Sequence, residues 1–162
     1  MESVNQQEVK RLLLQYLKES VNPQEVKRFL LQYRNAVNES KAALDHLAEI
    51  RAMAERITPA YGGSGGGSHE DDKLGAAVAR IIDMEGRVSD SIENLEATER
   101  EVTKVIDAVK DDIQRAILYE RYINGKTFER IAVSLSYCWR QTIRLHGLAL
   151  MSAGEAMRER CH

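Results

Sequence analysis

Apolar residues recur at alternating steps of four and three along two long stretches of the chain, which predicts two long amphipathic helices. The first stripe, with a skip at Ser40, consists of Val26, Leu30, Tyr33, Val37, Leu44 and Leu47. The second stripe consists of Leu74, Val78, Ile81, Val88, Ile92, Leu95, Val102, Ile106, Val109 and Ile113. Heptad stripes of this kind are typical of coiled coils. We therefore expect an all-α protein in which residues 21–110 form a long antiparallel helical hairpin.

The segment between the stripes, "ITPAYGGSGGGSHEDD", predicts a loop over residues 58–72. Pro59 ends the first helical pattern, and five glycines and two serines follow within residues 62–68. The composition fits a natural hairpin loop and an engineered linker equally well.

Two glutamates, Glu85 and Glu99, interrupt the second stripe. They are either tolerated at a solvated edge or set the register and the oligomeric state. A stripe this narrow and long is not fully buried by one hairpin partner. We therefore expect the chain to form homo-oligomers through the hairpin.

An internal repeat stands at the front of the chain. "VNQQEVKRLLLQY" at residues 4–16 returns as "VNPQEVKRFLLQY" at residues 21–33, with eleven of thirteen positions identical. The second copy leads into the long helix, with Asn22 as its N-cap and Pro23 at its first position. The first copy predicts an extra amphipathic helix over residues 1–20, either a local duplication or an added segment.

Residues 111–162 change to shorter helical patterns with sharp stops. Two acids open "DDIQRAILYERYING", which ends at Asn124–Gly125, and Thr127 is placed to N-cap "FERIAVSL". Only Ser136 and Tyr137 remain for a turn before the last helix, at residues 138–150. This order of three helices with a tight second turn is the layout of a helix-turn-helix module.

The last helix has two different faces on a helical wheel. Its packing face is expected to hold Cys138, Thr142, Leu145 and Ala149. The candidate DNA-binding residues are Ser136, Trp139, Arg140, Gln141, Ile143, Arg144 and Gly147. Two guanidinium groups one turn apart can reach guanine edges or phosphates in a major groove, and a glycine lets a backbone approach closely. The alternative for the two arginines is that they are ordinary solvated charges, and Trp139 either packs on the surface or touches DNA or a partner.

The charge distribution agrees with this placement. Residues 69–110 hold six bases and eleven acids, whereas residues 111–162 hold eight bases and six acids. The surplus of bases is modest and by itself says little about nucleic acid.

The stretch "LYERYINGKTFERIAVSLSYCWRQTIRLHGLAL" resembles region four of sigma-70-type factors, which grips the promoter −35 element and the polymerase flap. Residues 21–150 also resemble a family of small proteins from Gram-positive phages and prophages, similar to the ArpU and RinA late-transcription regulators. Several members carry a helical hairpin with a glycine-rich loop after "TP-Y", which favours a natural loop here. The resemblance implies a transcriptional regulator whose partners are double-stranded promoter DNA and host RNA polymerase.

Three residues depart from the sigma-like pattern, and one of them, Thr142, stands at a position that is usually aliphatic. The positions of Trp139 and Ile143 are usually polar or charged in such modules, so base reading by this helix is in question. The alternative is a non-enzymatic protein-interaction or DNA-packaging module, similar to a small terminase, that uses the hairpin and the Trp139/Ile143 face.

The sequence offers no support for catalysis. It has no glycine-rich phosphate loop between a strand and a helix and no nucleophile motif. The histidines are scattered, and the cysteines, Cys138 and Cys161, are isolated. We expect neither enzymatic activity nor a cofactor or metal site. No apolar run approaches the roughly 18 residues of a membrane span, and the start "MESVNQQEVKR" lacks a signal-peptide core, so we expect a cytoplasmic protein of a bacterial host cell.

Overall fold

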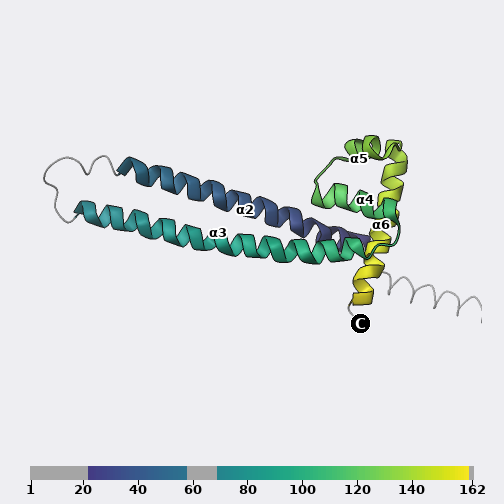
Figure 1. The fold of residues 1–162 in the computed structure, drawn as a ribbon, viewed down its shortest axis with the longest axis horizontal. Helices are drawn as coiled ribbons and strands as arrows, with labels where there is room; N and C mark the ends of the chain where they lie inside the picture. The colour runs from purple at the N-terminus through teal and green to yellow at the C-terminus, as the bar shows by residue number, and fades with distance from the viewer. Residues whose placement is uncertain (1–21, 58–68, 161–162) are drawn as a thin grey trace, which may run out of the picture. The chain divides into compact units, whose positions relative to one another are not determined.

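The computed structural model describes residues 22–57 and 69–160, and all the regular structure within them is helical (Figure 1). The all-α prediction is therefore confirmed. The elements are α2 (Pro23–Ile57), α3 (His69–Asp107), α4 (Asp112–Leu118), the π-helical turn η2 (Tyr119–Ile123), α5 (Phe128–Leu135) and α6 (Trp139–Arg160). The predicted helix over residues 1–20 and the loop residues 58–68 lie outside the described residues. Residues 69–72, which the sequence assigned to the loop, form the first turn of α3.

The chain divides into two compact units. Tyr33–Glu99 form one, which we call the hairpin unit, and the residues on either side of this range form the other, the C-terminal unit. The helices α2 and α3 each contribute to both units, so the division falls inside them.

In the hairpin unit, α2 and α3 lie side by side and antiparallel (Figure 1). The hydroxyl of Ser40 donates a hydrogen bond to the carbonyl of Ser91 over 2.9 Å. Farther along α2, a guanidinium nitrogen of Arg51 lies 2.6 Å from a carboxylate oxygen of Glu85. A later residue of α2 thus meets an earlier residue of α3, as an antiparallel pair requires. The buried cluster between the helices consists of Leu47, Ile50, Met84 and Val88, with Ala43 and Ile81 packed against it.

The buried stripe of the hairpin unit differs from the one that the sequence predicted. Ala36 and Ser40 are buried in α2, whereas Val37 and Leu44 are exposed. In α3, Met84 is buried while Val78 and Ile92 are exposed. The predicted stripe of α2 has two rows at seven-residue spacing. The row that contains Val26 and Leu47 was predicted correctly, whereas Val37 and Leu44 of the other row are replaced in the interior by the residues before them, Ala36 and Ala43. This shifted row includes Ala36, Ala43 and Ile50 on α2, whereas Ser40 lies in the correctly predicted row and is buried there, bonded to the Ser91 carbonyl.

The C-terminal unit has a denser core. Its largest fully buried side chains come from every helix that takes part: Val26, Leu30, Val102, Val105, Ile106, Val109, Ile117, Leu118, Tyr122, Ile131 and Thr142. The helix α6 packs against both α4 and α5. It also extends ten residues beyond the expected end at residue 150, with Ala153 and Ala156 buried.

Three helix starts carry an N-cap, and two of these caps, Asn22 and Thr127, were predicted from the sequence. The side chain of Asn22 accepts a hydrogen bond from the Gln24 amide over 3.0 Å, immediately before Pro23 opens α2. Asp111 caps α4 by accepting from the Gln114 amide over 2.8 Å. Thr127 caps α5 by accepting from the Arg130 amide over 3.4 Å. Each cap satisfies an amide that would otherwise lack a partner at a helix N-terminus.

Candidate nucleic-acid interface

A turn of three residues joins α5 to α6, as a helix-turn-helix layout requires. Ser136 adopts a left-handed conformation with φ 58° and ends α5. The amide of Tyr137 donates to the Ala132 carbonyl over 2.9 Å, which closes the turn. The helix α6 then begins at Trp139, and the amide of Thr142 in its first turn donates to the Cys138 carbonyl over 3.0 Å.

The face of α6 that packs is defined by its buried residues. These residues are Thr142, His146, Ala149, Leu150, Ala153, Gly154 and Ala156. At about 100° per residue they lie on the side of the helix opposite Arg140, Arg144 and Gly147, which are exposed. The packing of α6 therefore turns the two arginines outward.

Every candidate DNA-binding residue except Ile143 is exposed, and Ile143 is half-buried. Four exposed side chains at the start of α6 line an open depression of about 340 Å³: Cys138, Arg140, Gln141 and Arg144. The structure thus gathers both arginines and Gln141 around one concave surface. No acidic residue occurs in α6 before Glu155, so nothing on this helix neutralises that surface.

Two residues that the sequence assigned to the packing face lie elsewhere. Cys138 is exposed, because it precedes the first residue of α6 and the helical wheel does not apply to it. Leu145 is only half-buried, and His146 occupies the buried position beside it.

The buried histidine was missed by the sequence analysis. A ring nitrogen of His146 is hydrogen-bonded to the Tyr122 hydroxyl over 3.0 Å, and the Phe128 ring meets the imidazole edge-on at 4.9 Å between centroids. Burial, with smaller contributions from Arg121 and Lys27, lowers the pKa of His146 to about 4. The imidazole is therefore neutral at pH 7 and joins η2, α5 and α6. On the helical wheel its position lies about 40° from Thr142 and about 60° from Ala149, so the same wheel places His146 beside the packing face.

A second group of contacts holds the loop between η2 and α5. The guanidinium of Arg121 stacks over the Phe128 ring at 4.5 Å and donates to the Lys126 carbonyl over 2.9 Å. Glu120 forms an ion pair with Lys126 and accepts from the side chain of Asn124 over 3.2 Å. Gly125 supplies the positive φ of 67° that the loop needs. These contacts fix α5 against η2.

Trp139 lies at the junction of α5 and α6 and is 54% exposed. Glu129, in the first turn of α5, has a lowered pKa. The causes are its own backbone amide, the Thr127 hydroxyl and, more weakly, the Trp139 indole. The indole N–H thus already faces a carboxylate, while its ring remains open to solvent.

Gly147 has no packing reason to be glycine. A methyl group added there would meet no atom within 4 Å. Glycine inside a helix is less stable than alanine by roughly 1 kcal/mol. An exposed glycine in line with Arg140 and Arg144 is consistent with close approach of another molecule's backbone.

Other kinds of site find little support in the part of the chain that the structure describes. There, no three His, Cys, Asp or Glu side chains come together in a way that would hold a metal ion. The described helices also include none with the length and apolar character to cross a membrane.

No protein-family model matches the chain, and no curated protein and no solved structure matches it either. The similarity to sigma region four and to phage regulators thus rests on the residues quoted above, and it remains a prediction.

Proposed function

We propose that the chain is a DNA-binding transcriptional regulator in which α6 enters the major groove of promoter DNA. The observation that supports this most directly is the division of α6 into a buried face and an arginine face. Arg140 and Arg144 stand one turn apart near the start of the helix, around an open depression. Helix-turn-helix proteins contact base edges with this part of their second helix.

Four exposed residues of this face have a role in the proposed complex. The guanidinium groups of Arg140 and Arg144 donate to guanine edges or to phosphates. Gln141 offers an amide that can pair with adenine. Gly147 lets the sugar–phosphate backbone approach α6 closely, because no side chain stands in the way.

The cellular setting of this function follows from the resemblance to phage and prophage regulators. We propose that the chain acts in the cytoplasm of a bacterial host, on promoters of phage genes, and that host RNA polymerase is a further partner. Self-association through the hairpin unit would join two such modules. Two weak modules on one assembly bind their linked DNA sites at a high effective concentration.

A second candidate function is protein recognition by the same region. Val133 on α5 is 81% exposed and Trp139 is more than half exposed, and large apolar side chains of this kind often anchor partners. In this version the chain is an interaction or DNA-packaging module, and α6 presents Trp139 and Ile143 to a protein.

Binding of duplex DNA by the purified chain, with Arg140→Ala and Arg144→Ala as variants, tests the proposal. Bound fragments are selected from random duplexes and sequenced, and affinity is then measured by fluorescence anisotropy over a range of salt concentrations. Each variant should lose roughly 1–3 kcal/mol of binding free energy. A phosphate contact lowers the salt slope by about one unit, and a base contact relaxes preference at one position.

The matched control is Arg80→Ala on the hairpin unit, an exposed arginine that should leave DNA affinity unchanged. Unchanged DNA binding by both α6 variants would exclude the proposed interface.

The variant Trp139→Ala distinguishes DNA binding from protein recognition by α6. If it spares DNA affinity while abolishing capture of a protein partner, α6 faces a protein.

A further inference from the structure

The exposed apolar side chains of the hairpin unit are unevenly distributed around it. Among the described residues of this unit, six large hydrophobic side chains are exposed, and five of them share one side. We call these five the apolar flank: Val37, Leu44, Val78, Ile82 and Ile92. They are between 36% and 62% exposed.

One ion pair shows that the two helices contribute to the same flank. Val37, Leu44 and Arg51 follow one another at seven-residue intervals on α2, so they share one edge of that helix. Val78, Glu85 and Ile92 do the same on α3. Because Arg51 and Glu85 are bonded across the helices at 2.6 Å, both edges lie on one side of the hairpin. Ile82 stands one turn after Val78 and belongs to this side as well.

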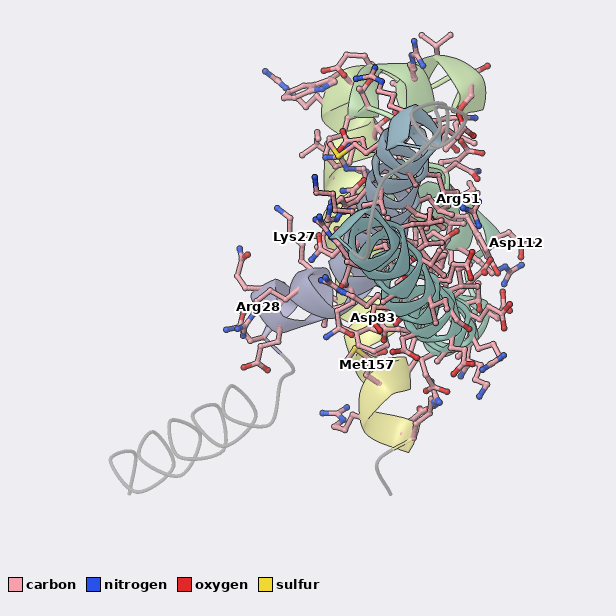
Figure 2. All side chains as sticks on the ribbon, turned by 90° about the vertical axis from the view of Figure 1, so that its left-hand side faces the viewer. Lys27, Arg28, Arg51, Asp83, Asp112 and Met157 are labelled. Carbon is pink, nitrogen blue, oxygen red and sulfur yellow. The ribbon has the colours of Figure 1, made fainter. Side chains whose placement is uncertain are left out.

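The other side of the hairpin is polar. Its corresponding edges carry Glu39 and His46 on α2 and Arg80 and Arg87 on α3, and Met53 is its exposed hydrophobic residue. Arg51 and Asp83 project from different sides of the α2–α3 pair (Figure 2). Exposed large apolar side chains gathered on one side of a molecule are typical of an interface.

The charges beside the apolar flank identify the occupant. On α2 the charges three residues before Val37 and Leu44 are basic, Arg34 and Lys41, and Arg51 follows, whereas the acidic Glu55 lies in the same row beyond Arg51. On α3 they are acidic, namely Glu85, Glu96 and Glu99. A second copy turned about a two-fold axis can lay its α2 over this α3 and its α3 over this α2. The basic residues on α2 of each copy then lie next to the acidic residues on α3 of the other copy. Both copies contribute the same surface to this interface.

We propose that a second copy of the chain packs on the apolar flank, each α2 over the other copy's α3, to form a four-helix bundle. This deepens the self-association included in the proposed function and rests on it. The seven-residue spacing supports the assignment, because a second copy presents apolar side chains at the same intervals. The buried stripe between α2 and α3 also includes small residues such as Ala36 and Ser40, so the bundle would add the large side chains that this stripe lacks.

Sedimentation velocity on the full chain, from low to tens of micromolar, tests the proposal. The parent should be a dimer. Leu44→Glu or Ile82→Glu should raise the dissociation constant by on the order of 100-fold, because a charge would be buried without a partner. Circular dichroism should show unchanged helicity, since both side chains are exposed in the single chain.

The matched control is Met53→Glu, which adds the same charge at a similarly exposed residue of the other side. It should change the dissociation constant by less than about threefold, as expected of a surface substitution. A monomeric parent would overturn the proposal and leave the apolar flank to a different partner. Equal disruption by Met53→Glu and Ile82→Glu would also overturn it.

A charge exchange tests the pairing of α2 with α3. Lys41→Glu and Glu96→Lys should each weaken the dimer by on the order of tenfold, and the double variant should restore much of the loss. Losses of dimer affinity that simply add in the double variant would contradict this pairing.

Binding of duplex DNA is measured on the same samples. A monomeric parent that binds DNA overturns only the dimer, and a dimer without DNA affinity overturns only the proposed function.

Discussion

The hairpin unit and the C-terminal unit are both helical, yet they are stabilised in different ways. In the C-terminal unit, short helices enclose large side chains such as Ile117, Leu118 and Tyr122, which are almost completely buried. In the hairpin unit, two long helices share a single narrow buried stripe that includes Ala36 and Ser40, and several of its large hydrophobic residues face outward. A helix with neighbours on several sides can bury a wide stripe, whereas a helix with one neighbour buries a narrow one.

The two units leave different surfaces exposed, one suited to binding a ligand and the other to assembly. The C-terminal unit completes its own core, so its outward residues, including Arg140 and Arg144, are available for a ligand. The hairpin unit leaves apolar surface uncovered, which suits assembly. Variants that act on one unit and spare the other test this contrast.

The largest expected difference is in the cost of removing a buried leucine. Leu118→Ala should lower the free energy of unfolding by roughly 2–5 kcal/mol, because a fully buried side chain leaves a cavity among several helices. Leu47→Ala in the hairpin unit should cost less, since it borders only one other helix. Urea unfolding followed by circular dichroism measures both, with exposed Leu148→Ala as the control near zero. Equal losses at Leu118 and Leu47 would remove the contrast between the units.

The next effect is a pH dependence that belongs to the C-terminal unit alone. The pKa of His146 is about 4 when folded and near 6.5 when unfolded, so the unfolded chain binds more protons between these values. The stability that depends on neutral His146 is complete above pH 6.5 and is lost as the pH falls toward 4. From pH 7 to pH 5 the loss should approach about 2 kcal/mol at most.

His146→Gln provides the comparison for this measurement. Its amide can still bond the Tyr122 hydroxyl but does not titrate, so its unfolding free energy should fall less between pH 7 and pH 5 than that of the parent. The charged groups that act on the imidazole are Arg121 and Lys27. The same slope in parent and variant would show that His146 does not control it.

The smallest effect compares one exposed helical glycine from each unit. Gly147→Ala and Gly86→Ala should each stabilise the protein by about 0.5–1 kcal/mol, because neither added methyl group meets a neighbouring atom. Only Gly147→Ala should weaken DNA binding, since only Gly147 lies on the arginine face. Thermal unfolding and anisotropy on both variants measure this. Equal DNA affinity in the two variants would show that no DNA backbone approaches Gly147.

Much of the fold was predictable because its signals are local. The heptad spacing predicted both long helices, and Asn22, Asp111 and Thr127 stand where helix N-caps stand. The wheel for the last helix predicted that Thr142 and Ala149 are buried and that Arg140 and Arg144 are exposed. All of these depend on residues within a turn or two of one another.

What the sequence did not decide depends on a neighbouring helix. A stripe with seven-residue spacing has two edges that repeat equally well, and only the second helix determines which edge is buried. Val37 and Leu44 were therefore predicted to be buried, but they face outward; Ser40 was predicted to interrupt the stripe because it is polar, but it is buried and bonded to Ser91. In the same way, His146 is buried because η2 and α5 bring Tyr122 and Phe128 to it. The sequence by itself determined which of the described segments are helices and where α2 and α5 begin, and tertiary packing decided which side of each helix is covered.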